Sequence, residues 1–211
     1  MKNVTLWALC LLLAACGLGE TGAAQLVARG FPAATGDAAD EYAVLRHQGR
    51  ATMIFANEAA GTSAEFVEVA SRGGTHSWRN AANIGLVTRD GFLLATRGLG
   101  HDAMAIDPGA AVVLVLTGQN GNSQRLHEEL NGDDRVRRHA FTCEIRTQGN
   151  RDIEIGGKSV STRLMAENCF SATGPSFTNL YWVRAGRVMQ ARHWVSAGFG
   201  TLAMRAPSVR G

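Results

Sequence analysis

Three short segments of the chain contain residue types that bind phosphates or metal ions in other proteins. They are 98–103 (GLGHDA), 156–159 (GGKS) and 127–130 (HEEL). The first would need a following helix to bind a dinucleotide, and Pro108 interrupts that helix. The second lacks the first glycine of a phosphate-binding loop, whose place Asp152 takes. The third begins like a zinc-protease helix, but Asn131 stands where the second histidine is required. We therefore predict no cofactor and no metal ion.

Catalytic residues are not evident either. The six histidines are dispersed without paired spacing, and the chain has no GxSxG elbow. A Ser–His–Asp site could still be assembled in space, because triads depend on geometry and not on sequence order. The sequence gives no positive sign of catalysis, so we predict that the protein is not an enzyme.

The strongest chemical signal is Cys16, which ends an apolar N-terminal run. Lys2 precedes the uncharged residues 4–15, a pattern that fits a signal peptide and is too short to span a membrane. The segment 13–16 (LAAC) resembles the bacterial lipoprotein signal-peptidase motif, in which the cysteine is acylated and becomes the first mature residue. Several acyl chains give stable anchoring, whereas one gives only marginal binding. We expect a signal peptide over 1–15 and lipid attachment at Cys16; an ordinary secretory signal is the alternative.

The residues after Cys16 predict where the protein goes. Gly17 follows the cysteine, and by resemblance to bacterial sorting rules this residue favours the outer membrane over the inner one. Residues 16–36 are small and turn-rich, which predicts a lipidated flexible tether. We expect a single folded domain over 37–211, anchored at the cell outer membrane and facing the periplasm.

Two cysteines remain after removal of the signal peptide, Cys143 and Cys169. Because the periplasm is oxidising, a lone pair of thiols there is a candidate disulfide. Cys143 alternates with Phe141 and Ile145, so the three would share one face of a strand. Two buried free thiols are the alternative. A metal site is not expected, because no CxxC or close His–Cys spacing occurs.

Aromatic residues near the C-terminus could contact a glycan or a partner protein. Tyr181, Trp182 and Trp194 lie in the last pair of predicted strands. An exposed aromatic ring beside Arg184 or Arg187 would suit stacking on a sugar. The alternative, which the usual burial of tryptophan favours, is that these aromatics fill the core.

The secondary structure that must position these residues is mostly β. A helix is predicted over 38–48, capped by Asp37 and ended by Gly49, and a second helix over 123–130. The predicted strands cover 51–56, 65–70, 84–89, 92–97, 112–117, 136–147, 152–155, 159–170, 178–184 and 187–195. Turn signals such as Asp90-Gly91 separate them. The pattern predicts a mainly β fold, an antiparallel meander that closes into a barrel-like or strongly curved sheet.

Composition agrees with this fold class. Glycine makes up 25 of 211 residues, and only 18% of the chain is charged, which favours β structure over surface helices. The hydrophobic share of 45% excludes disorder over most of the chain and suits one domain. The net charge of +3 comes from arginines scattered among acidic residues. Nucleic-acid-binding proteins cluster their positive charge, so we expect no nucleic-acid partner.

Two parts of the chain resemble the YjbF/GfcB family of lipoproteins, which are encoded with exopolysaccharide or group 4 capsule export systems. The first part runs from Trp78 through 86–91 (LVTRDG) to the exit 96–102 (TRGLGHD). The second begins with NLYWV and covers 179–195. The segment 103–140 matches the family least.

The resemblance implies a barrel-like antiparallel fold and a non-catalytic, accessory part in polysaccharide secretion. It implies partners among the outer-membrane and periplasmic proteins of an export system, with the polysaccharide as another candidate, and it supplies no catalytic residues. Two alternatives stay open. An enzyme acting on periplasmic glycans would need a cleft with an acid–base pair. A carrier of lipid or another apolar ligand would need a hollow barrel.

Overall fold

The computed structural model describes residues 37–130, 135–172 and 174–205, in which the chain forms twelve strands and two helices. The elements are α2 (Asp37–His47), β1 (Thr52–Asn57), β2 (Thr62–Arg72), β3 (Thr75–Arg79), β4 (Gly85–Arg89), β5 (Phe92–Arg97), β6 (Ala103–Asp107), α3 (Ala111–Thr117), β7 (Gly121–Leu130), β8 (Val136–Ile155), β9 (Lys158–Phe170), β10 (Phe177–Arg184), β11 (Arg187–Ser196) and β12 (Gly200–Arg205). Cys16, with the expected signal peptide and tether, lies outside the described residues.

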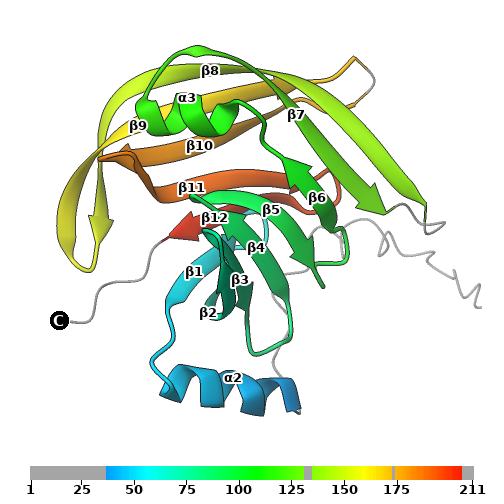
Figure 1. Cartoon of the computed structure of the whole chain (residues 1–211), viewed down its shortest axis with the longest axis vertical. Coiled ribbons are helices and arrows are strands. Elements are labelled where there is room, and N and C mark those ends of the chain that lie inside the picture. Colours follow the sequence, from blue (N-terminus) through cyan, green and yellow to red (C-terminus); the bar gives the residue numbers. More distant parts are fainter. Residues whose placement is uncertain (1–36, 131–134, 173, 206–211) are drawn as a thin grey trace, which may run out of the picture.

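The strands belong to one antiparallel sheet in the order β5-β4-β3-β2-β1-β12-β11-β10-β9-β8-β7-β6. A sheet of this size twists and curls, because each strand is rotated relative to its neighbour. The sheet forms a nearly closed barrel (Figure 1), which confirms the predicted fold class. Its two edge strands, β5 and β6, follow each other directly in the sequence.

The loop 98–102 leads the chain from one edge of the sheet to the other. Asp102 holds this loop, because its carboxylate accepts hydrogen bonds from the backbone N–H of Gly98 at 2.9 Å and of Leu99 at 3.2 Å. The hydroxyl of Thr96 donates to the same carboxylate at 2.7 Å and accepts the N–H of Ala103 at 3.0 Å. The seam between β5 and β6 is therefore closed by side chains.

Large side chains from the inward positions fill the barrel. The Phe55 and Phe66 rings pack edge to face at 4.9 Å, and the Phe177 and Trp194 rings stack nearly parallel at 4.4 Å. The indole N–H of Trp78, another buried ring, donates to the Thr88 hydroxyl at 2.8 Å. Buried aromatic rings supply large apolar areas, so the interior is a packed core.

Helix α2 agrees with the predicted helix over 38–48. It lies outside the barrel near β2 (Figure 1), where Arg46 forms an ion pair with Glu65 at 3.1 Å. The Tyr42 hydroxyl donates to the same carboxylate at 3.4 Å. Neither helix in the described part of the chain is long and apolar enough to cross a membrane.

The strand predicted over 112–117 is wrong, because this apolar run forms helix α3. Its buried residues, Ala111 and Val115, are four positions apart, so they share one helical face. Gly118 ends the helix with a φ of 73°, and its N–H donates to the Val115 carbonyl at 3.1 Å. The helix packs against β7, β8 and β10, under the arch of β8 (Figure 1). A short apolar run has no period that separates a buried strand from a buried helix.

The helix predicted over 123–130 is also wrong, because these residues belong to strand β7. Ser123, Arg125 and His127 all point into the barrel, at the two-residue spacing of a strand. Because these inward positions are polar, hydrophobic periodicity does not reveal the alternation of the strand. Arg125 bonds to Glu167 of β9, and the Ser123 hydroxyl accepts the N–H of Ala111 in α3, so the strand depends on tertiary contacts.

Strand β8 joins two segments that were predicted as separate strands. Residues 148–149 form an irregularity between Thr147 and Asn150, where Gly149 has a φ of 81°, but the ladder with β9 continues on both sides. The strands β3, β6 and β12 were not predicted. The Asp90-Gly91 turn was predicted, and both residues have a positive φ, at 53° and 83°.

Candidate functional site

The hairpin of β10 and β11 carries all five residues that were predicted as glycan or partner contacts. Its turn is Ala185-Gly186, where both residues have a positive φ, 48° and 71°. The side chains of β10 alternate between the barrel interior and the outside. The turn reaches the edge of the barrel, where it lies between two pockets that share Gly186 in their lining.

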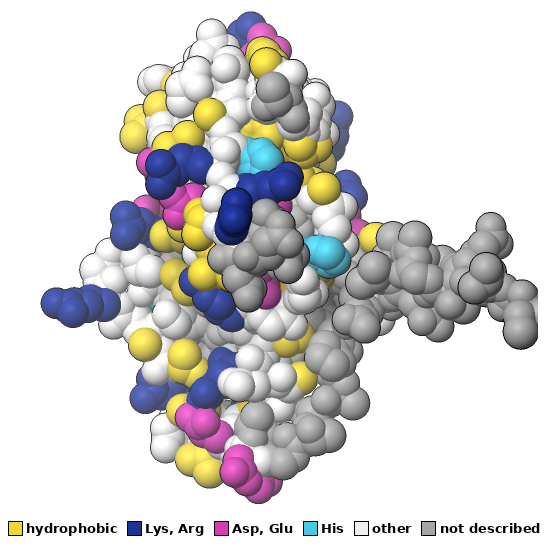
Figure 2. Space-filling model, turned by 90° about the vertical axis from the view of Figure 1, so that its right-hand side faces the viewer, with side chains coloured by type: hydrophobic (Ala, Val, Ile, Leu, Met, Phe, Trp, Pro, Cys, Tyr) yellow, Lys and Arg dark blue, Asp and Glu magenta, His cyan; other side chains and the backbone are white. Residues whose placement is uncertain are grey.

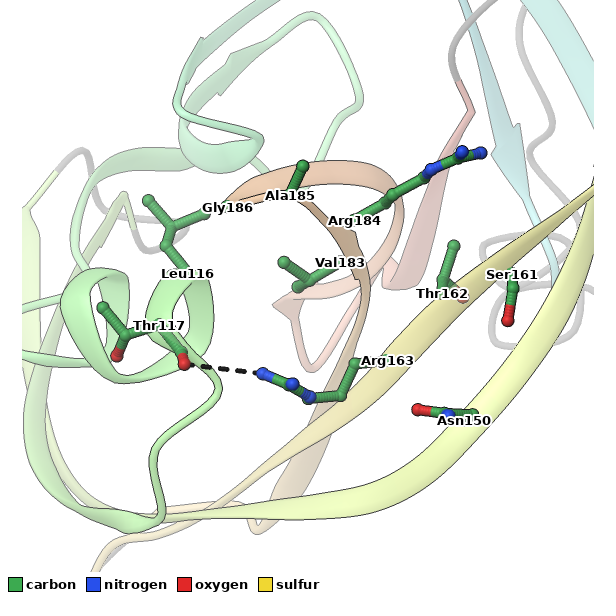
Figure 3. A pocket seen from close by; sticks show the side chains of 10 residues that line it. All are labelled: Leu116, Thr117, Asn150, Ser161, Thr162, Arg163, Val183, Arg184, Ala185 and Gly186. Carbon is green, nitrogen blue, oxygen red and sulfur yellow. Dashed lines mark hydrogen bonds between the residues drawn. The ribbon is translucent and has the colours of Figure 1, made fainter.

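The first pocket, here called the arginine pocket, has a volume of about 370 Å³ and lies between α3, β8, β9 and the β10–β11 turn (Figure 3). It is lined by Leu116, Thr117, Asn150, Ser161, Thr162, Arg163, Val183, Arg184, Ala185 and Gly186. Arg163 crosses one side of it, with Nη1 3.5 Å from the Thr117 carbonyl oxygen. The guanidinium lies over Gly118, where a Cβ would come within 1.8 Å of Nη1. The glycine that ends α3 therefore also makes room for Arg163.

The second pocket, here called the methionine pocket, has a volume of about 330 Å³ on the other side of the turn. It is lined by Met53, Gly74, His76, Trp78, Thr88, Asp90, Gly91, Gly186, Arg187, Val188, Met189 and Met204. Nδ1 of His76 lies 2.5 Å from Oε1 of Glu68, and its ring stacks on Trp78 at 5.8 Å. This pocket is more apolar than the arginine pocket.

A third feature is a polar cluster inside the barrel, formed by Arg125, His127, Glu167, Asn179 and Tyr181, all buried. Nη1 of Arg125 donates to both carboxylate oxygens of Glu167 at 3.0 Å. The Tyr181 hydroxyl and the Asn179 amide donate to Oε2 of the same carboxylate at 2.7 and 2.8 Å. Nε of Arg125 donates to Nε2 of His127 at 2.9 Å. The carboxylate is thus held by three side chains from two strands.

Burial and charge set the protonation of this cluster. Burial, and then the positive charge of Arg125, lower the pKa of His127 to about 2 and that of His193 to about 3. Burial and then Glu167 raise the pKa of Tyr181 well above its usual value. Burial alone would lower the pKa of Arg125, but Glu167 outweighs it and raises that pKa. At neutral pH both histidines are therefore neutral and Tyr181 keeps its proton.

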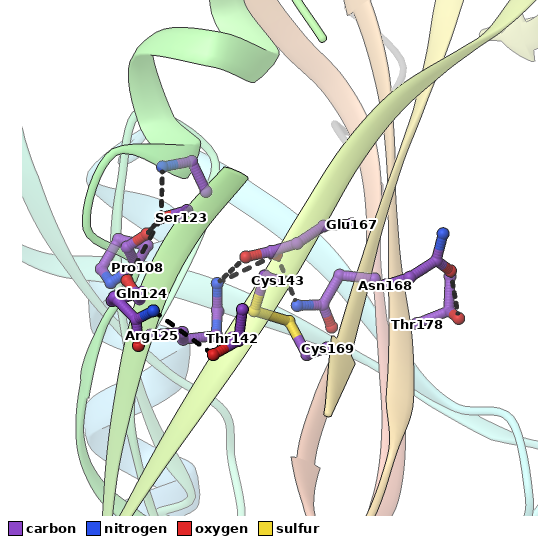
Figure 4. Close-up of a disulfide and its surroundings, with 12 residues drawn as sticks. Pro108, Ser123, Gln124, Arg125, Thr142, Cys143, Glu167, Asn168, Cys169 and Thr178 are labelled. Carbon is purple, nitrogen blue, oxygen red and sulfur yellow. Dashed lines mark hydrogen bonds and ion pairs between the residues drawn. A yellow bond between two sulfur atoms is a disulfide. The ribbon is translucent and has the colours of Figure 1, made fainter. Parts of the chain in front are cut away.

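The predicted disulfide between Cys143 and Cys169 is confirmed (Figure 4). The two residues stand directly opposite each other in the β8–β9 ladder, and their Cα atoms are 4.1 Å apart. Glu167 lies close enough to both sulfurs to complete a three-ligand metal group among the described residues. The sulfurs are bonded to each other and the carboxylate is hydrogen-bonded to three side chains, so the donors are already engaged.

The five predicted contact residues lie in different surroundings. Tyr181 is completely buried and Trp194 is 8% exposed, so both belong to the core and neither offers a ring to the surface. Trp182 is half-buried on the outer face of β10. Arg184 lines the arginine pocket and Arg187 lines the methionine pocket. Of the five, the two arginines are exposed.

Sequence reasoning missed Arg125, Glu167, Arg163 and Asn150. Arg125 and Glu167 stand at inward positions of their strands, and Glu167 is two residues before Cys169. A charged residue in phase with a buried cysteine is the signal that could have identified Glu167. Arg163 and Asn150 are paired in the β8–β9 ladder. They line a pocket only because α3 packs nearby and supplies Leu116 and Thr117 to the same lining.

The residues that carry the family resemblance make structural contacts. Trp78 bonds to Thr88, as described above. Gly91 packs so tightly on Val188 that a Cβ would lie 2.4 Å from the valine Cβ. Oδ1 of Asn179 accepts the backbone N–H of Trp194 at 2.8 Å, next to the point where the β10–β11 ladder stops. These motif residues hold the barrel together at its seams and turns.

Surface charges away from the pockets are mostly mixed. Figure 2 shows basic and acidic side chains interspersed on one face, with hydrophobic side chains in separate patches. Several arginines form exposed ion pairs, such as Arg138 with Glu128 at 2.5 Å and Arg146 with Glu144 at 2.6 Å. The lining of the arginine pocket differs, since it contains two arginines and no acidic residue.

Comparison with known proteins identifies a family and a similar solved structure. Residues 41–206 match the model of a family described as group 4 capsule polysaccharide lipoprotein gfcB, YjbF. The crystal structure of the hypothetical lipoprotein YmcC from Escherichia coli (K12) has the same fold, with a TM-score of 0.67 and 19% sequence identity. The likeness covers 82% of this chain and 96% of that one. No curated protein matches the chain.

Proposed function

Because this chain belongs to the YjbF family of group 4 capsule polysaccharide lipoproteins, we propose that it is a lipid-anchored accessory protein of exopolysaccharide or capsule secretion. The anchor is the acylated Cys16, and the body faces the periplasm from the outer membrane. The partners are outer-membrane and periplasmic proteins of the same export system. The observation that carries the proposal is the family match, which covers residues 41–206.

The proposed role is binding, without catalysis. The completely buried titratable groups Arg125, His127 and Glu167 are bonded to one another. None of them lines the arginine pocket or the methionine pocket. A general acid or base needs contact with its substrate, and these groups lack it. They stabilise the barrel instead.

The packed interior favours an accessory protein over a carrier of an apolar ligand. A carrier needs an open cavity of several hundred Å³ lined by apolar side chains. Inside this barrel, Phe92 packs on Tyr181 at 4.6 Å, and Phe141 packs on Phe177 at 4.9 Å. The two described pockets lie at the β10–β11 turn.

Metabolic labelling tests the anchor. We expect radiolabelled palmitate to enter the wild-type protein and the Cys10→Ser variant, because Cys10 belongs to the expected signal peptide. The Cys16→Ser variant should lose the label and leave the outer-membrane fraction. Labelling of Cys16→Ser, or a wild-type protein without label, would refute lipid attachment at this residue.

Deletion of the gene tests the export role. Surface polysaccharide, measured as uronic acid or total sugar released from washed cells, should fall in the deletion strain. A plasmid copy should restore it, whereas a Cys16→Ser copy should restore little. Unchanged polysaccharide in the deletion strain would count against a part in export.

A further inference from the structure

We infer that the arginine pocket binds an acidic sugar of an extended saccharide, and that the chain of sugars crosses the β10–β11 turn toward Arg187. This inference rests on the proposed function, since it names what the protein would hold during export. It is carried by the placement of three arginines around one turn. Arg163 and Arg184 lie in the first pocket and Arg187 in the second.

The charge of the arginine pocket favours an anion. Its ten lining residues include Arg163 and Arg184 and no aspartate or glutamate. Neither arginine forms an ion pair in the described part of the chain, unlike Arg138 and Arg146. A guanidinium offers five N–H donors in a planar fork that matches a carboxylate. Arg163 uses one of them in a long contact with the Thr117 carbonyl.

The other lining groups suit a sugar more than a bare anion. Asn150, Ser161 and Thr162 supply an amide and two hydroxyls, which can pair with sugar hydroxyls. Asp152 stands opposite Ser161 in the β8–β9 ladder and is outside this lining. The lining contains no aromatic residue, so recognition there depends on charge and hydrogen bonds.

The shared turn favours a polymer over a single sugar. Gly186 lines both pockets, so a ligand that fills one pocket can continue over the turn into the other. The turn lies beside α3, since a Cβ built at Gly186 would be 3.9 Å from the Leu116 carbonyl oxygen. Arg187 and the half-buried Met53 and Met189 of the second pocket would meet the next sugars. We expect a disaccharide to occupy the arginine pocket alone.

Nuclear magnetic resonance titration tests the site with the lipid-free mature domain. The probes are acid-released fragments of the source strain's own surface polysaccharide and hexagalacturonate, with digalacturonate, maltohexaose and inorganic phosphate for comparison. We expect the two long acidic probes to shift the amide signals of 117–118, 150, 161–163 and 183–188. Maltohexaose and phosphate should bind at least tenfold more weakly, and digalacturonate should shift only the signals of the arginine pocket.

Charge variants give the decisive comparison. Arg163→Gln and Arg184→Gln remove the charge but keep a polar side chain, and each should weaken binding about tenfold, the usual effect of losing one charged hydrogen bond. Arg184→Glu, at an exposed residue, should abolish binding even if Arg163→Gln proves unstable. Arg187→Gln should weaken hexagalacturonate and leave digalacturonate unchanged. Arg137→Gln removes an exposed arginine that lines neither pocket and should bind like the wild type.

The outcomes separate this inference from the proposed function. Binding of neither long acidic probe, or equal binding by Arg184→Glu and the wild type, would overturn the inference while the deletion phenotype could still stand. Binding at the pocket by a protein whose deletion leaves the polysaccharide unchanged would support the site and contradict the export role.

Discussion

Arg125 and Glu167 form an ion pair in which both side chains are completely buried, with Nη1 3.0 Å from each carboxylate oxygen. The pair connects β7 to β9 across the intervening β8. Burying two charges is costly, and good geometry with further hydrogen bonds offsets that cost. Asn179 and Tyr181 provide such bonds from β10. Strands β7, β9 and β10 are therefore connected through one carboxylate.

Removal of the negative charge should be strongly destabilising. In Glu167→Gln the guanidinium of Arg125 would stay buried without a counter-ion, and we expect a loss of about 3–5 kcal/mol in the free energy of unfolding. Denaturation in urea measures it. The matched control is Glu144→Gln, which breaks an exposed pair with Arg146 and should cost less than about 1 kcal/mol. Similar losses in the two variants would contradict this account of the cluster.

Stability should fall as the pH decreases from 6.5. His127 and His193 have pKa values of about 2 and about 3 in the folded protein, below the ordinary value of 6.5. The unfolded chain therefore binds more protons than the folded one in this range, so acid favours unfolding. Between pH 6.5 and 5 the two histidines together should remove about 3 kcal/mol of stability.

Urea denaturation at a series of pH values measures this loss. The double variant His127→Gln with His193→Gln should have a flatter profile over the same range, because glutamine does not titrate. A wild-type profile without a slope between pH 6.5 and 5 would show that these histidines are not held neutral.

The disulfide should stabilise the domain against unfolding. Cys143 and Cys169 are separated by 26 positions, and closing a loop of that length is worth about 3 kcal/mol in the chain-entropy model. The variant Cys143→Ser with Cys169→Ser should lose about this amount, measured by guanidinium denaturation. A reductant should lower the stability of the wild type and leave the double variant unchanged. Equal sensitivity of both proteins to the reductant would refute this role.

Gly91 should tolerate alanine poorly, because its φ is 83° and an added Cβ would lie 2.4 Å from the Cβ of Val188. Left-handed strain and the clash together predict a loss of about 3 kcal/mol. Gly61→Ala is the control, since its φ is 62° with no atom within 4 Å, and it should lose only about 1 kcal/mol. Thermal unfolding distinguishes the two. Adding Val188→Ala to Gly91→Ala should restore part of the stability. If stability does not recover, the loss does not come from the clash with Val188.

Local signals in the sequence determined the elements whose conformation depends on neighbouring residues. The Asp90-Gly91 turn was predictable because few residue pairs accept two consecutive positive φ values. The disulfide was predictable from compartment and from the strand phase of Cys143. The strands β5, β9, β10 and β11 also agree closely with their predicted ranges, because turn residues mark both ends.

Only the tertiary structure decided the features that depend on partners distant in the chain. The run at 111–117 forms a helix whose buried side packs against β7, β8 and β10, and the inward Arg125 of β7 is paired with Glu167, which lies 42 residues away. The arginine pocket likewise needs α3, β9 and the β10–β11 turn in one place. Hydrophobic periodicity reports which face of a segment is buried, but it carries no information on which polar groups the fold will bring together.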